Sequence, residues 1–270
     1  EMASLLLELA AARQRALAQL VSPEDAALVS DPNNILGVEY CKVLLQSGSS
    51  ITPLAMERRA VGHNEGEAGG FASASYIRAL LAGGEDASAF LTAESVAIYA
   101  RECAAGRAPV TMKGAERAML SRLRMLEEAD FARYDSGGEG LYRRFYAAVR
   151  TAASVDELLG TVKTKRYAYA RLRRMLLAAY LDIAAAELPQ EIPYLRILAC
   201  NERGRMLLRA IKNEGSAPVL TKSADVRSLS EEAQRLFALS ARACDQYVLA
   251  YPELRAAKGG GAWTQGPVIV

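Results

Sequence analysis

The sequence predicts an α/β segment followed by a region that is mostly α-helical. Hydrophobic residues make up 51% of the 270 residues and aromatic residues only 7%. Ala and Leu crowd many segments, a composition that favours helices over a β-sandwich or barrel. One helical pattern follows another from about residue 86, and only a few short apolar runs are typical of strands. We therefore expect two domains, residues 1–85 and residues 86–270.

Charge and cysteine content narrow the classes of protein. Lys and Arg number 33 and Asp and Glu 31, a net charge of +2, so any nucleic-acid role depends on local clusters of cations. The four cysteines contain no CxxC pair, which argues against a zinc knuckle and indicates reduced thiols. Neither a signal peptide nor an apolar run of the ~18 residues that span a membrane is visible. We expect a cytoplasmic protein with no membrane partner.

The first elements are helical. Leucines at helical spacing predict an amphipathic helix over residues 1–20, and this pattern is already running at Glu1, so the chain looks cut from something longer. Ser22-Pro23 then predicts a stop followed by a short turn. Asp31 as N-cap and Pro32 at the first helical position predict a helix to about Gln46, which Gly48 ends.

A strand, a loop and a second helix are expected next. Residues 51–59, from Ile51 to Arg59, have the pattern of a strand. Residues 62–70 are too polar and glycine-rich for regular structure, so we expect a mobile loop over a site. A helix begins at Ser73, continues through Leu81, and stops at Gly83-Gly84.

Capping signals mark the helical region. Ser154 to Glu157 and Ser228 to Glu231 both have the form of a capping box, in which Ser and Glu each bind a backbone N–H. A long helix is predicted over residues 164–186. Short apolar runs at 194–199 and 218–221 flank a helical stretch at 202–212, which predicts a small βαβ unit.

Two pairs of residues near the start are candidate nucleotide ligands. Asn33 and Asn34 open the helix, and an amide offers a donor and an acceptor that suit the edge of an adenine or a ribose. Arg58 and Arg59 close the strand, where a guanidinium can clamp phosphate through its fork of donors. The residues alone leave plainer interpretations open. The two Asn amides can face water while Asp31 caps the helix, and the two arginines can be a solvated basic pair, which is the favoured interpretation for Arg59.

The start of the next helix is a candidate anion site. Ser73 and Ser75 are small hydroxyls at a helix N-terminus, where free N–H groups and the helix dipole favour an anion, and Arg78 follows one turn later. The alternative is an ordinary serine cap.

Residues 163–174 are a candidate RNA contact. The segment has six basic side chains, two interleaved tyrosines and no acid. Phosphates are bound by Lys and Arg, and unstacked bases by aromatic or guanidinium planes. On a helix, Arg166 and Arg173 would share one face, and Tyr167, Arg171 and Arg174 a neighbouring one. The residues alone favour a solvated face with its tyrosines packed inward. The basic residues are Lys163, Lys165, Arg166, Arg171, Arg173 and Arg174.

Taken in order, these motifs resemble the bacterial tRNA(Met) cytidine acetate ligase family, a branch of the HxGH-type nucleotidyltransferase superfamily. The first part of the resemblance is SxPNNxLGxxY from Ser30, an Arg-ended strand, and SASxIR from Ser73. Further matches are KTKRYxxxRLxR from Lys163, the blocks at 194–198 and 201–205, and the Pro267-Val268-Ile269 terminus. The matching motifs are spread over nearly the whole chain.

The resemblance implies an ATP-dependent, tRNA-modifying ligase. Such enzymes activate acetate as acetyl-adenylate and acetylate N4 of the wobble cytidine of elongator tRNA(Met), with ATP as cofactor. From the chemistry of ATP we expect Mg²⁺ with it. It also implies that residues 1–85 are the C-terminal half of a Rossmann-like nucleotidyltransferase domain and residues 86–270 a helical tRNA-binding domain. By position, Asn33 and Arg58 match the family's ATP-contacting Asn and Arg. Ser73 and Arg78 fall in the element that contacts phosphates.

This sequence departs from the family pattern in three places. Ser75 stands where the family usually has Thr, which keeps the hydroxyl. His63, the only histidine, is displaced by one position from the family's His, and we assign it no catalytic role. A single histidine cannot make an HxGH motif, so the catalytic residues stay unassigned, and we expect a missing N-terminal segment as a further partner. The chain alone is then expected to bind ATP poorly and to form no adenylate.

Two other functions compete with this one. A nucleotidyltransferase-like enzyme with a different acceptor would keep the ATP chemistry, since a fold alone does not choose a substrate. A non-catalytic helical RNA-binding protein would keep only the basic surface.

Overall fold

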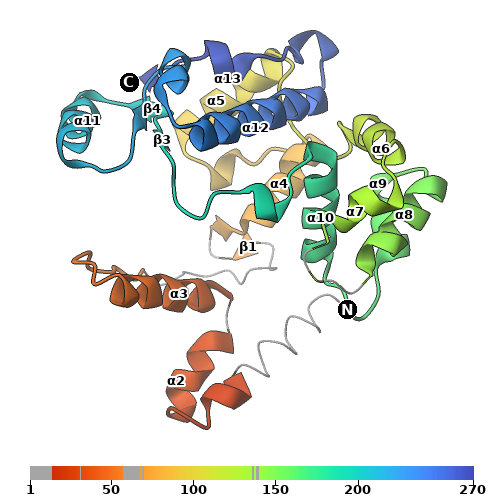
Figure 1. The fold of residues 1–270 in the computed structure, drawn as a ribbon, viewed down its shortest axis with the longest axis horizontal. Coiled ribbons are helices and arrows are strands. Elements are labelled where there is room, and N and C mark those ends of the chain that lie inside the picture. The colour runs from red at the N-terminus through yellow and green to blue at the C-terminus, as the bar shows by residue number, and fades with distance from the viewer. Residues whose placement is uncertain (1–13, 31, 57–66, 69, 136, 138–139) are drawn as a thin grey trace. The chain divides into compact units, whose positions relative to one another are not determined.

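The computed structural model describes residues 14–30, 32–56, 67–68, 70–135, 137 and 140–270. Its contacts divide the chain into two units, residues 1–77 with 163–172, and residues 78–162 with 173–270. Figure 1 shows that most elements are helices and that the strands are short. Among the described residues, no helix is both long and apolar enough to cross a membrane.

The first unit contains short helices and one hairpin. The helix predicted from Pro32 to Gln46 is confirmed as α3 with those bounds, and Gly48 follows it with a φ of +60°. The helix pattern of the first residues ends before Ser22-Pro23, as predicted, but the short turn predicted next is wrong. The Ser22 Oγ accepts a hydrogen bond from the Asp25 N–H and caps a new helix there. The elements are α2 (Pro23–Ala27), a 3₁₀ turn (Leu28–Ser30), α3 (Pro32–Gln46), β1 (Glu67–Ala68) and β2 (Phe71–Ala72).

The region between α3 and α4 corrects two expectations. Residues 51–56 are not a strand: Pro53 has no N–H to donate to a ladder, and Ile51 and Leu54 are exposed. The rest of that predicted strand lies outside the described residues. The predicted 62–70 loop ends in regular structure, because β1 pairs antiparallel with β2, with Gly70 between them at a φ of +79°.

Helix α4 (Ala74–Gly83) crosses from the first unit to the second and begins and ends where predicted. The second unit then continues with consecutive helices. Their largest fully buried side chains include Leu123, Phe131, Phe145 and Leu158, and the four helices that supply these side chains pack against one another. The helices are α5 (Ala93–Ala104), α6 (Glu116–Arg124), α7 (Glu128–Ala132), α8 (Leu141–Thr151) and α9 (Val155–Val162). Helix α10 (Tyr169–Leu181), like α4, crosses from the first unit to the second.

The capping predictions have different outcomes. Ser154 caps α9: its Oγ accepts from the Glu157 N–H at 3.0 Å, and the Glu157 carboxylate accepts from the Ala153 N–H. Ser228 does not cap the later helix α12 (Glu231–Tyr247). Ser230 does, through the Ala233 N–H, because Ser228 lies in a 3₁₀ turn over residues 223–228.

The predicted βαβ unit is confirmed. Strand β3 (Leu195–Arg196) pairs parallel with β5 (Val219–Leu220), and α11 (Glu202–Glu214) lies between them in sequence. Strand β4 (Ala199–Cys200) pairs parallel with β6 (Val268–Ile269). This part has its own core, in which the ring of Phe237 lies 4.7 Å from that of Trp263, on α13 (Gly261–Thr264). The core residues are Leu220, Val226, Phe237, Ala241 and Ala262.

Candidate nucleotide and RNA sites

The start of α4 is the best-defined part of the predicted nucleotide site. Ser73 is 3% exposed and is the only buried polar side chain in the described part of the chain. Its Oγ accepts a hydrogen bond from the Tyr76 N–H at 3.2 Å and lies 3.0 Å from the Ser75 Oγ. Ser73 therefore caps the helix, as the plainer interpretation predicts. A helix start leaves four N–H groups without a partner inside the helix, so the cap leaves others for a ligand.

The other predicted nucleotide ligands are only partly described. Asn33 and Asn34 lie in the first turn of α3, and Asn34 is exposed. Arg78 is exposed on α4. No hydrogen bond or ion pair among the described residues joins Asn34 to Ser73 or Arg78. Arg58, Arg59 and His63 lie outside the described residues, so their roles stay predictions.

The basic segment does not form the helical face that its spacing predicts. Helix α10 begins at Tyr169, so the prediction of a helix over 164–186 is wrong at both ends. Where the helix is expected to begin, the Thr164 Oγ1 accepts a hydrogen bond from the Arg166 N–H at 3.3 Å, and this local bond competes with helix formation. Lys163, Lys165 and Arg166 therefore lie in the turn before α10, while the other three basic residues lie on the helix.

The two tyrosines of this segment are in contact with its cations. Tyr167 is 5% exposed, with the Arg171 and Arg166 guanidinium carbons 5.1 and 6.0 Å from its ring centroid. The Lys163 Nζ lies 5.5 Å from the ring centroid of Tyr169. Such contacts stabilise the turn through cation–π attraction. The buried ring of Tyr167 is not free to stack on a base, whereas Lys165 is exposed.

A polar cluster that the sequence did not predict surrounds Asp182, at the end of α10. Asp182 has a φ of +56° and accepts a 2.7 Å hydrogen bond from the Tyr134 hydroxyl. The guanidinium groups of Arg133 and Arg122 lie 3.8 and 3.9 Å from its carboxylate. The Tyr134 hydrogen bond and these cations lower the pKa of Asp182, and burial with the same hydrogen bond raises the pKa of Tyr134 to about 12.

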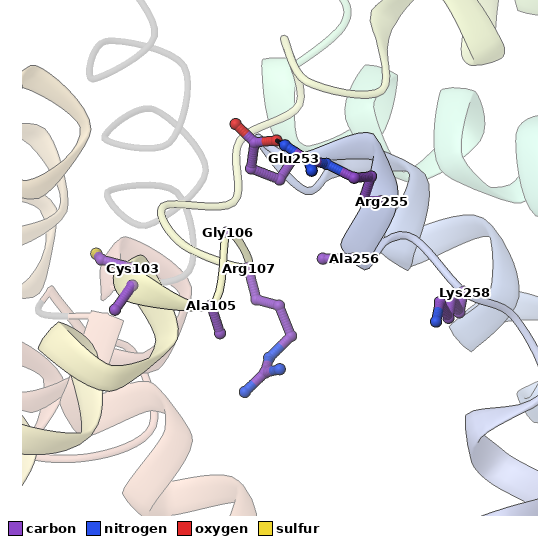
Figure 2. Close-up of a pocket in the computed structure, with 9 residues that line it drawn as sticks. Cys103, Ala105, Gly106, Arg107, Glu253, Arg255, Ala256 and Lys258 are labelled. Carbon is purple, nitrogen blue, oxygen red and sulfur yellow. Dashed lines mark ion pairs between the residues drawn. The ribbon is translucent and has the colours of Figure 1, made fainter.

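A hollow of about 650 Å³ lies between the turn after α5 and residues 253–258 (Figure 2). The Arg107 side chain extends into it, and its Nε donates to the Glu102 carboxylate at 2.6 Å, which lowers the pKa of Glu102. Glu253 and Arg255 form a second pair at 3.9 Å. Each of its arginines is paired with a carboxylate, and Lys258 is a further cation of the lining. None of the residues predicted to bind a ligand lines this hollow.

Sequence comparison identifies the family. The profile of the HIGH nucleotidyl transferase family matches residues 4–260. The chain belongs to this family. It is 33% identical over 234 residues to the tRNA(Met) cytidine acetate ligase of Fervidobacterium nodosum, covering 84% of this chain. It is 31% identical over 259 residues to that of Acetivibrio thermocellus, covering 90% of this chain. The resemblance read from the motifs is thereby confirmed. The chain spans 55% and 62% of the lengths of these relatives.

Solved structures agree on the fold. The chain superposes on TmcAL of Thermotoga maritima bound with alpha-thio ATP, with a TM-score of 0.86 and 26% identity, over 96% of this chain and 64% of that one. The apo form of that protein gives a TM-score of 0.88 at 24% identity, over 97% of this chain and 66% of that one. The predicted fold class, an α/β segment of a nucleotidyltransferase followed by a mostly helical region with a small βαβ unit, is confirmed, and the chain is mostly helical with few parallel strands.

Proposed function

We propose that this chain is part of an ATP-dependent ligase that acetylates N4 of the wobble cytidine in elongator tRNA(Met). The observation that carries the proposal is the similarity to tRNA(Met) cytidine acetate ligases over 84% and 90% of this chain. Membership of a nucleotidyl transferase family supports ATP as the activating substrate. We assign ATP binding to residues 1–85 and tRNA binding to residues 86–270.

The reaction requires two transfers. Acetate does not acylate an amine directly, because oxide is a poor leaving group, so a carboxylate oxygen first attacks the α-phosphorus of ATP. The bond between the α-phosphorus and the bridging oxygen breaks, giving acetyl-adenylate and pyrophosphate. The cytidine N4 amine then attacks the acetyl carbonyl, AMP leaves, and N4 loses a proton. Both steps build negative charge on phosphate oxygens, which backbone N–H groups and guanidinium groups stabilise.

The proposed ATP ligands divide by chemistry. Asn33 and Asn34 present amides to the adenine or ribose, and the Arg58 guanidinium, with that of Arg59, binds phosphate. At α4, the Ser73 cap holds the first turn in place, and the N–H groups that it leaves face the phosphates together with Arg78. We propose that Mg²⁺ enters with the ATP phosphates. The described part of the chain contains no group of three His, Cys, Asp or Glu side chains that could hold a metal ion.

The proposed tRNA contact is the basic segment 163–174. Lys165, Arg173 and Arg174 are exposed and are suited to phosphate. The buried ring of Tyr167 supports the turn rather than a base, so the contact relies on cations more than on stacking. Such binding depends strongly on salt.

One substitution separates an anion site at α4 from an ordinary cap. Ser75 is exposed in the first turn of α4, where a carboxylate interacts favourably with the helix dipole by about 0.3–1 kcal/mol. Ser75→Asp should therefore keep or raise thermal stability. A carboxylate about 4 Å from a phosphate charge costs about 1 kcal/mol even in water, so the Kd for ATP should rise about fivefold or more. Ser75→Asn is the neutral control, and an unchanged ATP affinity in Ser75→Asp would remove α4 from the site.

Acetyl transfer is tested with the protein as the cell makes it. The protein is incubated with ATP, isotope-labelled acetate and total tRNA, and the tRNA nucleosides are analysed by mass spectrometry. Labelled N4-acetylcytidine confined to elongator tRNA(Met) is the expected result. Label on another RNA or small molecule would indicate a different acceptor, and RNA binding with no ATP–pyrophosphate exchange would indicate a non-catalytic RNA-binding protein.

A further inference from the structure

The βαβ unit surrounds a small cavity outside the predicted sites. Its central segment, residues 195–200, forms backbone hydrogen bonds on both sides. On one side the Leu195 N–H donates to the Pro218 carbonyl oxygen, and on the other the Leu198 carbonyl oxygen accepts from the Val268 N–H. Helix α11 starts at Glu202, directly after this segment. Helix and strands are neighbours in Figure 1.

The cavity has an apolar floor and cationic walls. It measures about 240 Å³, below the roughly 300–1,000 Å³ typical of drug-sized ligands, so it suits one ring system rather than a whole nucleotide. Arg205 and Arg209, one helical turn apart on α11, line it, and both are exposed. Within the described residues neither arginine has an ion-pair partner. The apolar lining comes chiefly from Ile197, Leu208, Pro267 and Ile269.

The rest of α11 adds two cations and, at its two ends, two acids, Glu202 and Glu214, so the whole helix has a net charge of +2. Residues 203–213 contain four basic side chains and no acidic one, and α11 buries no side chain. Arg203 and Lys212 are exposed, and so are Met206 and Leu207, whose exposed fractions are 61% and 60%. We define the α11 face as Arg205, Arg209 and Lys212, which share one side of the helix, together with the cavity.

We propose that the α11 face binds a single-stranded or loop segment of RNA, with one unstacked base in the cavity and Arg205 and Arg209 on the adjoining phosphates. The inference rests on the proposed function, because it assumes an RNA acceptor, and it adds a contact outside residues 163–174. Single-stranded RNA is bound by cations along the backbone and by guanidinium or apolar surfaces against splayed bases. A membrane-binding helix needs a continuous apolar face, and here cations flank two apolar side chains.

The test compares two variants that each lose two positive charges. Arg205→Ala with Arg209→Ala removes the proposed phosphate contacts. Arg235→Ala with Arg255→Ala is the control, since both arginines are exposed elsewhere in the same unit. Binding of labelled elongator tRNA(Met) is measured by fluorescence anisotropy from 50 to 200 mM KCl, and folding of each variant is checked by thermal denaturation.

Each contact to single-stranded RNA adds about 0.7 to the slope of log affinity against log salt. The α11 variant should therefore have a slope shallower by about 1.4. Over the fourfold salt range, wild-type affinity should fall about sevenfold more than that of the variant, and the control should match wild type. A wild-type slope in a folded α11 variant overturns the α11 contact alone. Absence of tRNA binding by the wild-type protein at 50 mM KCl overturns the proposed function as well.

A crosslink identifies the partner directly. With p-benzoylphenylalanine at position 206, irradiation of the protein with tRNA and lipid vesicles should give a covalent RNA adduct that RNase shortens. Adducts only to lipid or to a second protein chain would overturn the RNA assignment.

Discussion

Substituting Asp182 by Asn should lower the free energy of unfolding in a pH-dependent way. Asp182 has a φ of +56°, in the left-handed region that Asn tolerates as well as Asp. The substitution therefore keeps the backbone and the side-chain size and removes only the negative charge. That charge accepts the Tyr134 hydrogen bond at 2.7 Å and attracts Arg133 and Arg122.

The size of the effect follows from these contacts. A hydrogen bond to a charged group contributes about 1.5–3 kcal/mol and a neutral one about 0.5–1.5 kcal/mol. Asn keeps a neutral acceptor, so the difference is about 1 kcal/mol. The two ion pairs are long, and the Asp182 side chain is 36% exposed, so solvent screening limits them to about 0–1 kcal/mol together. We expect a loss of about 1–2 kcal/mol at pH 7.

The pH dependence gives the test its direction. The pKa of Asp182 is lowered in the folded state, so its contribution is complete above the unfolded pKa of about 3.9 and is lost as the pH falls through the folded value. The pKa of Tyr134 is raised to about 12. Its contribution is complete below the unfolded pKa of about 10 and is lost as the pH rises toward about 12.

Urea unfolding, followed by circular dichroism from pH 3 to pH 11, measures the loss of stability at both ends of the pH range: the acidic limb from Asp182 and the alkaline limb from Tyr134. The difference between wild type and Asp182→Asn should shrink below about pH 4. Tyr134→Phe should remove the alkaline limb, and the double variant should lose less than the sum of the single losses, because both act on one bond. A difference that stays constant from pH 3 to pH 7, or strict additivity, would refute this account.

Three further substitutions test other parts of the structure. Arg150→Ala should cost about 1–2 kcal/mol in urea unfolding, because its guanidinium donates to two carbonyl oxygens at the end of α6 and packs on an aromatic ring; Arg150→Lys should recover only part of this. Phe237→Ala should cost about 3–5 kcal/mol and red-shift the fluorescence of Trp263, the only tryptophan, because it empties the core of the βαβ unit. Lys165→Ala with Arg166→Ala should make the salt slope of tRNA binding shallower by about 1.4, and an unchanged slope would exclude this turn from the RNA contact.

The sequence predicts those elements whose determinants are local. Helix α3 has its predicted bounds because Pro32 fits the first helical position and Gly48 supplies the left-handed turn after its end. The start of α4 at Ser73 and that of α9 at Ser154 depend on one side-chain bond each, to an N–H three residues along. The parallel pairing of β3 with β5 follows from two apolar runs around one helix.

The errors arise where the outcome depends on contacts distant in sequence or on competing local bonds. Thr164 diverts residues 163–168 into a turn although their composition suits a helix. The Asp182 cluster joins side chains 48 residues apart in sequence, so no motif announces it. Arg205 lies in the motif block at 201–205, but the cavity beside it forms only when β4, β6 and the residue after β5 come together. Part of the nucleotide site is still a prediction, because Arg58 and Arg59 lie outside the described residues.

The small net charge of the chain conceals a marked separation of charge. Residues 163–174 contain six basic side chains and residues 203–213 four, with no acid in either stretch. Outside these stretches, the chain has 23 basic side chains against 31 acidic ones. Under the proposed function, the net negative charge of the remainder opposes a polyanion, and the two stretches supply the attraction to RNA. If the cations of either stretch are replaced by neutral residues, the repulsion from the acidic remainder becomes larger relative to the attraction that is left. RNA binding should then be lost at a lower salt concentration than the number of lost contacts alone predicts.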